Sequence, residues 1–129
     1  MTSERKKIMI VEDDEDLHTL YGLYLQGQDY EILRAFNGLE AFKILETAKP
    51  DLIILDMIMP VMDGEEFFVR LRTEKKLTDI PVIIASVNDK IAPKILKLGN
   101  IHKILKKPFP IEVLLKEIEA GLSAGARPA

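Results

Sequence analysis

The sequence contains no cysteine among its 129 residues. This absence excludes disulfide bonds, thiol catalysis and cysteine-ligated metal sites, and it is typical of a reducing compartment, so we expect a cytoplasmic location. An excess of basic charge is also missing, because 18 Lys and Arg residues face 21 Asp and Glu residues and leave a net charge of −3. That balance argues against a dedicated nucleic-acid binder.

Long apolar runs, repeats and low-complexity blocks are absent as well. The longest apolar runs have about four to six residues, too few for a membrane span or for the core of a secretory signal. With 47% hydrophobic and 30% charged residues, the composition is that of one globular domain. We expect this domain to occupy residues 1–122, and residues 123–129, which lack an apolar period, to form a flexible tail or the stump of a linker.

Short apolar segments alternate with segments of helical periodicity along the whole chain. Three runs that are apolar on both faces predict central strands of a parallel sheet. Two further runs mix charge into the pattern, as edge strands do. The predicted central strands are 8–11, 52–55 and 82–85, and the predicted edge strands are 30–35 and 102–105.

The segments between these strands have apolar residues at helical spacing. The first predicted helix covers 17–25 and ends at Gly27, and the second covers 38–47, where Asn37 and Glu40 form a capping box. Three more helices are predicted after Gly64, near Pro93 and from Ile111. Strands and helices in this order predict an α/β domain whose sheet is covered on both faces. Functional residues are then expected at the carboxyl ends of the strands.

Five consecutive acids, residues 12–16, follow the first predicted strand. A solvated loop with one acid capping the next helix explains residues 14–16. It does not explain Glu12 and Asp13, which directly follow a buried strand, and for these a cation site is the better interpretation. Oxygen ligands with no cysteine or histidine nearby favour Mg²⁺.

Three more polar residues stand at the ends of later strands. Asp56 lies between apolar neighbours well before the next helix, so it is a candidate nucleophile and a third carboxylate for the cation. Ser86 is either an ordinary loop residue or a hydrogen-bond donor, and Lys107 is either solvated or the counter-charge to the acids. Together these groups suit phosphoryl chemistry, in which Asp56 attacks phosphorus while Ser86 and Lys107 bind phosphoryl oxygens.

Other catalytic signatures are missing from the sequence. No glycine-rich loop follows the first strand, so a nucleotide cradle is not predicted, and neither G-x-S-x-G nor H-E-x-x-H occurs. His18 and His102 are far apart in the sequence, and we expect both at the surface and not in a metal site.

The segments IMIVEDDEDL, NGLEAFKIL, KPDLIILDMIMPVMDG, DIPVIIAS and KKPF, in this order, resemble a response regulator receiver domain of two-component signalling over residues 6–122. The resemblance implies a flavodoxin-like (βα)5 fold, a five-stranded parallel sheet of order 2-1-3-4-5 with helices on both faces. It also implies phosphorylation of Asp56 by a histidine kinase or a phosphotransfer protein. The resemblance implies that Glu12, Asp13, Asp56 and the Ile58 backbone carbonyl bind Mg²⁺. It also implies that Ser86 is the switch hydroxyl, that Lys107 pairs with the phosphate, and that the Lys107–Pro108 peptide is cis.

Several positions depart from the pattern of this family. Glu12 replaces the more usual Asp, which lengthens one ligand arm. Val87 stands where a small residue is usual and could narrow access to Asp56. Ile104 stands at the aromatic switch position, so an aromatic rotamer change is not available. Pro93 interrupts the fourth helix, which should therefore start there, be short or be kinked.

The resemblance implies a Mg²⁺-dependent conformational switch that is no enzyme beyond its own phosphorylation and dephosphorylation. The alternative within the family is a degenerate receiver that binds proteins irrespective of phosphorylation. A dehalogenase-type phosphatase needs a second Asp where Ile58 stands, and the acids after the first strand would repel the phosphate of a flavin.

A basic segment lies between Ser86 and Pro110, with six lysines and one acid in a chain that is acidic overall. These lysines can be an ordinary solvated face. Their one-sided excess instead favours docking of an acidic partner protein through the fourth helix and fifth strand, with Lys90, Lys94 and Lys97 in contact. Direct nucleic-acid binding is not predicted, since no aromatic residues are interleaved for stacking.

Overall fold

Five parallel strands form a single sheet in the order β2-β1-β3-β4-β5, as predicted. The computed structural model describes residues 5–88 and 90–125. The strands are β1 (Lys6–Val11), β2 (Tyr30–Ala35), β3 (Leu52–Leu55), β4 (Val82–Ser86) and β5 (Ile101–Lys106). The helices are α1 (Glu15–Gln26), α2 (Gly38–Leu45), α3 (Gly64–Thr73), α4 (Pro93–Leu98) and α5 (Ile111–Gly125).

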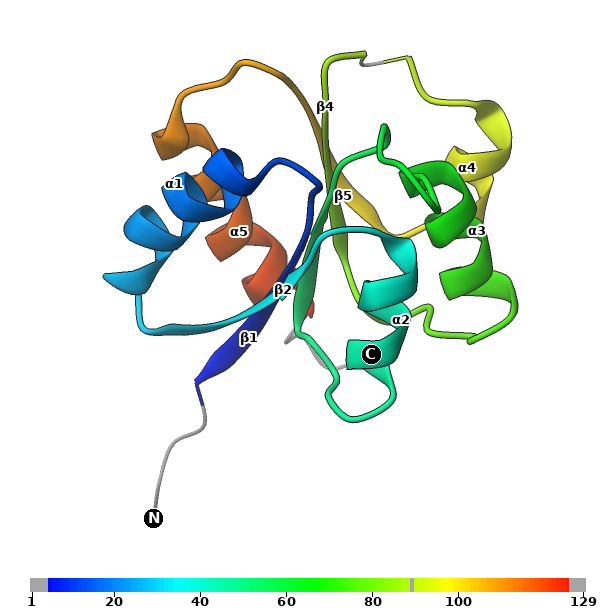
Figure 1. Ribbon diagram of the computed structural model, residues 1–129, viewed down its shortest axis with the longest axis horizontal. Helices are drawn as coiled ribbons and strands as arrows, with labels where there is room; N and C mark the ends of the chain where they lie inside the picture. The colour runs from blue at the N-terminus through cyan, green and yellow to red at the C-terminus, as the bar shows by residue number, and fades with distance from the viewer. Residues whose placement is uncertain (1–4, 89, 126–129) are drawn as a thin grey trace.

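The sheet is the middle of three layers, with α1 and α5 on one face and α2, α3 and α4 on the other (Figure 1). Alternate residues of each central strand enter the two cores. In β1, Ile8 and Ile10 pack beneath α1 and α5, while Met9 and Val11 pack on the opposite side. Each fully buried side chain of this size contributes about 1.5–3 kcal/mol. The strand is apolar on both sides in the sequence because helices cover both faces of the sheet.

Local signals start the first two helices where they were predicted. The Asp14 side chain accepts hydrogen bonds from the backbone N–H groups of Asp16 and Leu17 and caps α1. Asn37 accepts from the Glu40 N–H, and the Glu40 carboxylate accepts from the Phe36 N–H, which is a capping box displaced by one residue. These caps direct α1 and α2 away from the carboxyl edge of the sheet.

The fourth helix is short, and proline explains where it starts. Pro93 occupies the first turn, where its missing N–H is not needed, and Ala92 before it supplies no side-chain cap. Helix α4 ends at Leu98 before Gly99, which has a φ of 82° that favours glycine. The expectation of a short helix starting at Pro93 is confirmed.

The last helix runs through Gly125, so residues 123–125 of the predicted tail continue α5. Residues 126–129 lie outside the described part of the chain. Among the described residues, no helix has the length and hydropathy needed to cross a bilayer.

Candidate functional site

Three carboxylates meet at the carboxyl edge of the sheet. Glu12 and Asp13 follow β1, and Asp56 follows β3, the neighbouring strand, in which Leu55 pairs with Val11. One carboxylate oxygen from each acid lies within 4.8 Å of the others. Glu12 and Asp56 are buried, at 3% and 6% exposure, whereas Asp13 is exposed.

Lys107 brings a positive charge to this cluster from the loop after β5. Its Nζ lies 2.6 Å from Glu12 Oε1 and 3.5 Å from Asp56 Oδ2. The Lys107 N–H donates to the Ser86 carbonyl at 2.8 Å, and the Lys107–Pro108 peptide is cis, as predicted. Lys107 therefore belongs to the acid cluster and is not part of an outer basic surface.

The charges of the cluster are not balanced. Burial raises the pKa of the Glu12 carboxyl well above its ordinary value, and the nearby Asp56 charge acts in the same direction, against the opposing effects of Lys107 and the Asp14 N–H. Three carboxylates thus face one ammonium group. A divalent cation with oxygen ligands would offset the remaining repulsion, and the donor set is the one that Mg²⁺ prefers.

Ser86 adds a hydroxyl at the end of β4. It is 1% exposed, and within residues 5–88 and 90–125 its Oγ has no hydrogen-bond partner. A buried hydroxyl without a partner costs about 1–3 kcal/mol. A hydrogen-bond acceptor that binds at the site would therefore gain a favourable bond from the Ser86 hydroxyl.

The β3–α3 loop is held close to Asp56. The Ile58 N–H donates to Asp56 Oδ1 at 3.3 Å, and the Gly64 N–H donates to the Met57 carbonyl at 3.0 Å. A side chain at position 64 would collide with the Asp56 backbone, so only glycine permits this approach. The loop fixes the direction in which the Asp56 carboxylate points.

His18 is a supporting residue that the sequence analysis placed wrongly at the surface. It is 1% exposed, and its Nε2 lies 2.6 Å from the Glu12 carbonyl oxygen and 3.2 Å from that of Ala35. Both neighbours are acceptors, so Nε2 carries the proton. His18 shares a helix face with the buried Tyr21 and Leu25, and this spacing is the signal that could have revealed it. His102 is half-buried and pairs with Glu117 at 3.0 Å.

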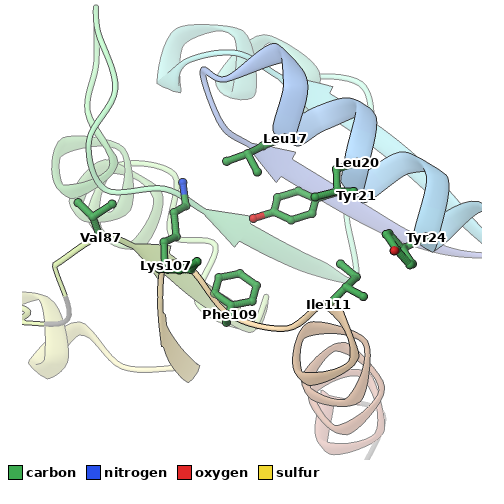
Figure 2. A pocket seen from close by; sticks show the side chains of 9 residues that line it. Leu17, Leu20, Tyr21, Tyr24, Val87, Lys107, Phe109 and Ile111 are labelled. Carbon is green, nitrogen blue, oxygen red and sulfur yellow. The ribbon is translucent and has the colours of Figure 1, made fainter.

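An apolar groove of about 520 Å³ adjoins the acid cluster. Leu17 and Tyr21 of α1 face Lys107 and Phe109 across it, and Val87 stands at its rim beside Lys107 (Figure 2). Burial raises the pKa of Tyr21, and the acids of the cluster act in the same direction. The acid cluster therefore has an apolar flank on the side of α1.

Residues 8–119 match the family described as response regulator receiver domain. The chain is 38% identical over 110 residues to the alkaline phosphatase synthesis transcriptional regulatory protein PhoP of Bacillus subtilis (strain 168), covering 84% of this chain and 45% of that protein. It is 35% identical over 113 residues to the response regulator GtcR of Aneurinibacillus migulanus, covering 86% and 46%. The chain thus spans about half the length of these curated relatives.

Solved structures agree with the fold. The signal receiver domain of a putative LuxO repressor protein from Vibrio parahaemolyticus superposes with a TM-score of 0.84 at 28% identity, covering 95% of this chain and 93% of that one. The response regulator protein TrrA from Thermotoga maritima, solved in complex with Mg²⁺-BeF, gives a TM-score of 0.75 at 29% identity, covering 90% and 98%.

Proposed function

The chain belongs to the response regulator receiver domain family, and from this premise we propose that Asp56 is its phosphoacceptor. Receiver domains act with histidine kinases in two-component signalling and are not conventional enzymes. The observation that carries the proposal is the convergence of three carboxylates, a half-buried ammonium and a buried hydroxyl with no partner among the described residues at one edge of the sheet. The phosphodonor is a histidine kinase or a phosphotransfer protein.

In the proposed reaction one Asp56 carboxylate oxygen attacks the donor's phosphorus. The P–N bond to the donor imidazole breaks as the bond to Asp56 forms, and the imidazole nitrogen keeps the electron pair. The Lys107 ammonium neutralises charge on the phosphoryl oxygens, and the Ser86 hydroxyl donates a hydrogen bond to one of them. The loop contacts of Ile58 and Gly64 hold the nucleophile in place, which reduces the entropic cost of the step.

A Mg²⁺ ion fits this set of ligands, with Glu12, Asp13, Asp56 and the Ile58 backbone carbonyl as the residues that would hold it. When bound, the ion supplies positive charge that neutralises the transferring phosphoryl group. The fit rests on the oxygen-only donor set and on the excess of carboxylates over ammonium groups.

Phosphorylation would act as a switch through Ser86. A hydrogen bond from its hydroxyl to the phosphoryl group would draw the end of β4 toward Asp56 and shift the loop that leads to α4. Ile104 is half-buried on β5 and is not aromatic, so the response would be carried by α4, whose first turn has no side-chain cap. We propose that the receiver domain occupies residues 1–122 and that residues 123–129, of which 123–125 extend α5, serve as a tail or linker.

The output partner is proposed to be an acidic protein that docks on α4 and β5. The side chains of Lys90, Lys94 and Lys97 are exposed, and Lys94 pairs only with the exposed Glu65 at 3.1 Å among the described residues. Exposed pairs of this kind contribute little, so the lysines remain available for a partner.

The phosphoacceptor assignment is tested with acetyl phosphate labelled in its phosphoryl group, in the presence of Mg²⁺. Replacing Asp56 with Asn keeps the shape and removes the nucleophilic carboxylate, so we expect labelling to disappear. Asp63→Asn is the matched control, because Asp63 is an acid of the same loop that caps α3 and Asn caps equally well. Labelling of Asp56→Asn at the wild-type rate would overturn the assignment.

A further inference from the structure

The groove beside the acid cluster is apolar along its length and charged at one end. Its walls are aliphatic and aromatic side chains of α1, of the loop after β5 and of the start of α5. Among the described residues that line it, Lys107 alone is charged. Figure 2 shows Lys107 near Leu17 at one end of the groove, with Tyr24 and Ile111 at the other. The groove therefore suits a ligand with one charged end and an apolar remainder.

Lys107 determines the chemistry of the charged end. Its Nζ lies 3.5 Å from Asp56 Oδ2, so a ligand group that pairs with Lys107 lies next to the phosphoacceptor. Glu12, Asp56 and the exposed Asp13 repel an anion there until a cation offsets their charge. With Mg²⁺ bound, a phosphoryl group would meet the ammonium, the cation and the nucleophile together. The charged end that this arrangement matches is thus a phosphoryl group.

The walls of the groove determine what the phosphoryl group is attached to. Apart from Lys107, the described side chains that line it offer two tyrosine hydroxyls and no other hydrogen-bonding group. A sugar or a nucleobase would leave most of its polar groups without partners, which costs free energy. An aliphatic chain would instead pack on Leu17 and Phe109 and would cover Leu20 and Tyr24, which are 42% and 45% exposed. The lining therefore favours an apolar chain.

We propose that the groove binds the acyl chain of small phosphodonors, so that the domain accepts a phosphoryl group faster from acyl phosphates with a longer apolar chain than from acetyl phosphate. In this step one Asp56 oxygen attacks phosphorus, the bond between phosphorus and the acyl oxygen breaks, and the released carboxylate keeps the electron pair. The balance needs no proton and no further reactant. The inference rests on the proposed function of Asp56 and adds the class of small donor that the site prefers.

The test compares acetyl, butyryl and hexanoyl phosphate, each labelled in its phosphoryl group, with Mg²⁺ present and at donor concentrations below saturation. The three leaving carboxylates have nearly equal basicity, so a difference in rate reports binding of the chain and not reactivity. A methylene group fully removed from water is worth about fourfold in rate, and the walls of the groove are only partly covered. We therefore expect butyryl phosphate to label the protein about fivefold faster than acetyl phosphate, and hexanoyl phosphate to be faster again.

Two variants locate the chain in the groove. Leu17→Ala removes apolar wall beside Lys107 and should lower the ratio of the butyryl to the acetyl rate to about twofold or less. Tyr24→Ala removes wall at the far end, so it should reduce the advantage of the hexanoyl chain over the butyryl chain. Leu23→Ala is the matched control, because Leu23 is an exposed apolar residue of α1 that does not line the groove.

Each result is a ratio between donors measured on one protein, so a loss of folded protein lowers all rates and leaves the ratio unchanged. Equal rates with the three donors on the wild type would overturn the proposal while the phosphoacceptor assignment stands. A preference for longer chains that is the same in Leu17→Ala, Tyr24→Ala and Leu23→Ala would place the chain elsewhere and would also overturn it. If no donor labels the wild type, the proposed function fails and this inference fails with it.

Discussion

His18 fixes the backbone from which Glu12 projects. Its Nε2–H is shared between the carbonyl oxygens of Glu12 and Ala35, and its ring packs on Phe36 with centroids 4.3 Å apart. Within the described residues the Nδ1 atom has no hydrogen-bond partner. A second proton on the ring would therefore be placed in a buried position with no acceptor.

Burial lowers the pKa of His18 below its ordinary value of 6.5, and the Arg34 charge adds to this against the opposing effects of the two carbonyl groups and Glu40. The unfolded chain therefore binds this proton more readily than the folded one. The contribution of neutral His18 to stability is complete above about pH 6.5 and is lost as the pH falls from there through the folded pKa.

Lowering the pH from 7.5 to 5 also protonates Glu12, whose raised pKa stabilises the folded chain, so the two groups act in opposite directions. The effect of His18 is therefore read from a comparison with His18→Gln, which keeps an N–H donor and cannot titrate. We expect the thermal midpoint of the wild type, measured in EDTA, to fall relative to that of His18→Gln as the pH is lowered. An identical pH profile for the two proteins would contradict the role given to the neutral ring.

The positions of single site residues could be predicted where chain order alone determines them. Parallel strands end at one edge, so residues that follow strands converge there, as Glu12, Asp56 and Lys107 do. The burial of His18 could be predicted from its helical spacing with Tyr21 and Leu25, but its role could not, because that role depends on backbone carbonyl groups, which the sequence does not mark.

Among the elements, α4 is held at its end by a charged side chain of α3. Arg72 of α3, 4% exposed, donates from its guanidinium to the carbonyl oxygens of Leu77, Gly99 and Asn100, and it stacks on Phe68 at 4.7 Å. Burial lowers the pKa of this guanidinium to about 10. One charged side chain thus anchors the turn between α4 and β5 to α3.

Replacing Arg72 with Met should lower the free energy of unfolding by about 2–4 kcal/mol, because three carbonyl groups lose a charged donor. The matched control is Arg70→Met on the same helix, whose exposed pairs with Glu66 and Glu74 predict a loss below about 0.5 kcal/mol. Urea denaturation gives both values. Equal losses would show that Arg72 is not an anchor.

Secondary structure was predictable where local chemistry decides it. The caps Asp14 and Asn37 and the break at Pro93 set the starts of α1, α2 and α4 in the sequence itself. The anchoring of α4 was not predictable, because Arg72 reads as a polar residue on the outer face of a helix until the turn at Gly99 is placed above it.

For the whole molecule, Mg²⁺ should raise stability by binding the folded chain alone. At a Mg²⁺ concentration ten times the dissociation constant the gain is about 1.4 kcal/mol, or several degrees in thermal midpoint. Asp13→Asn should reduce this response, because it removes an exposed carboxylate of the site. Asp16→Asn, which removes an acid of the first turn of α1 outside the cluster, should keep the response. A midpoint indifferent to millimolar Mg²⁺ would refute the site.

Charge is distributed unevenly over the molecule. The surface formed by α4, β5 and the loop before α4 carries exposed lysines, although the net charge of the chain is −3. Long-range attraction should speed the approach of an acidic protein to this surface and should weaken once the Debye length falls below about 10 Å, near 0.1 M salt. The probe is a glutamate-rich peptide, with duplex DNA of equal charge for comparison.

We expect the wild-type protein to bind the peptide at low salt, and reversal of Lys90, Lys94 and Lys97 to Glu to abolish both the binding and its salt dependence. Reversal of three exposed lysines elsewhere changes the net charge equally and should retain most of the binding; suitable positions are Lys6, Lys43 and Lys76. If both triple variants lose binding alike, only net charge matters and the surface is an ordinary solvated one. Preference for DNA over the peptide would instead make nucleic acid the partner of this surface, because a protein partner offers acidic side chains and not a regular row of phosphates.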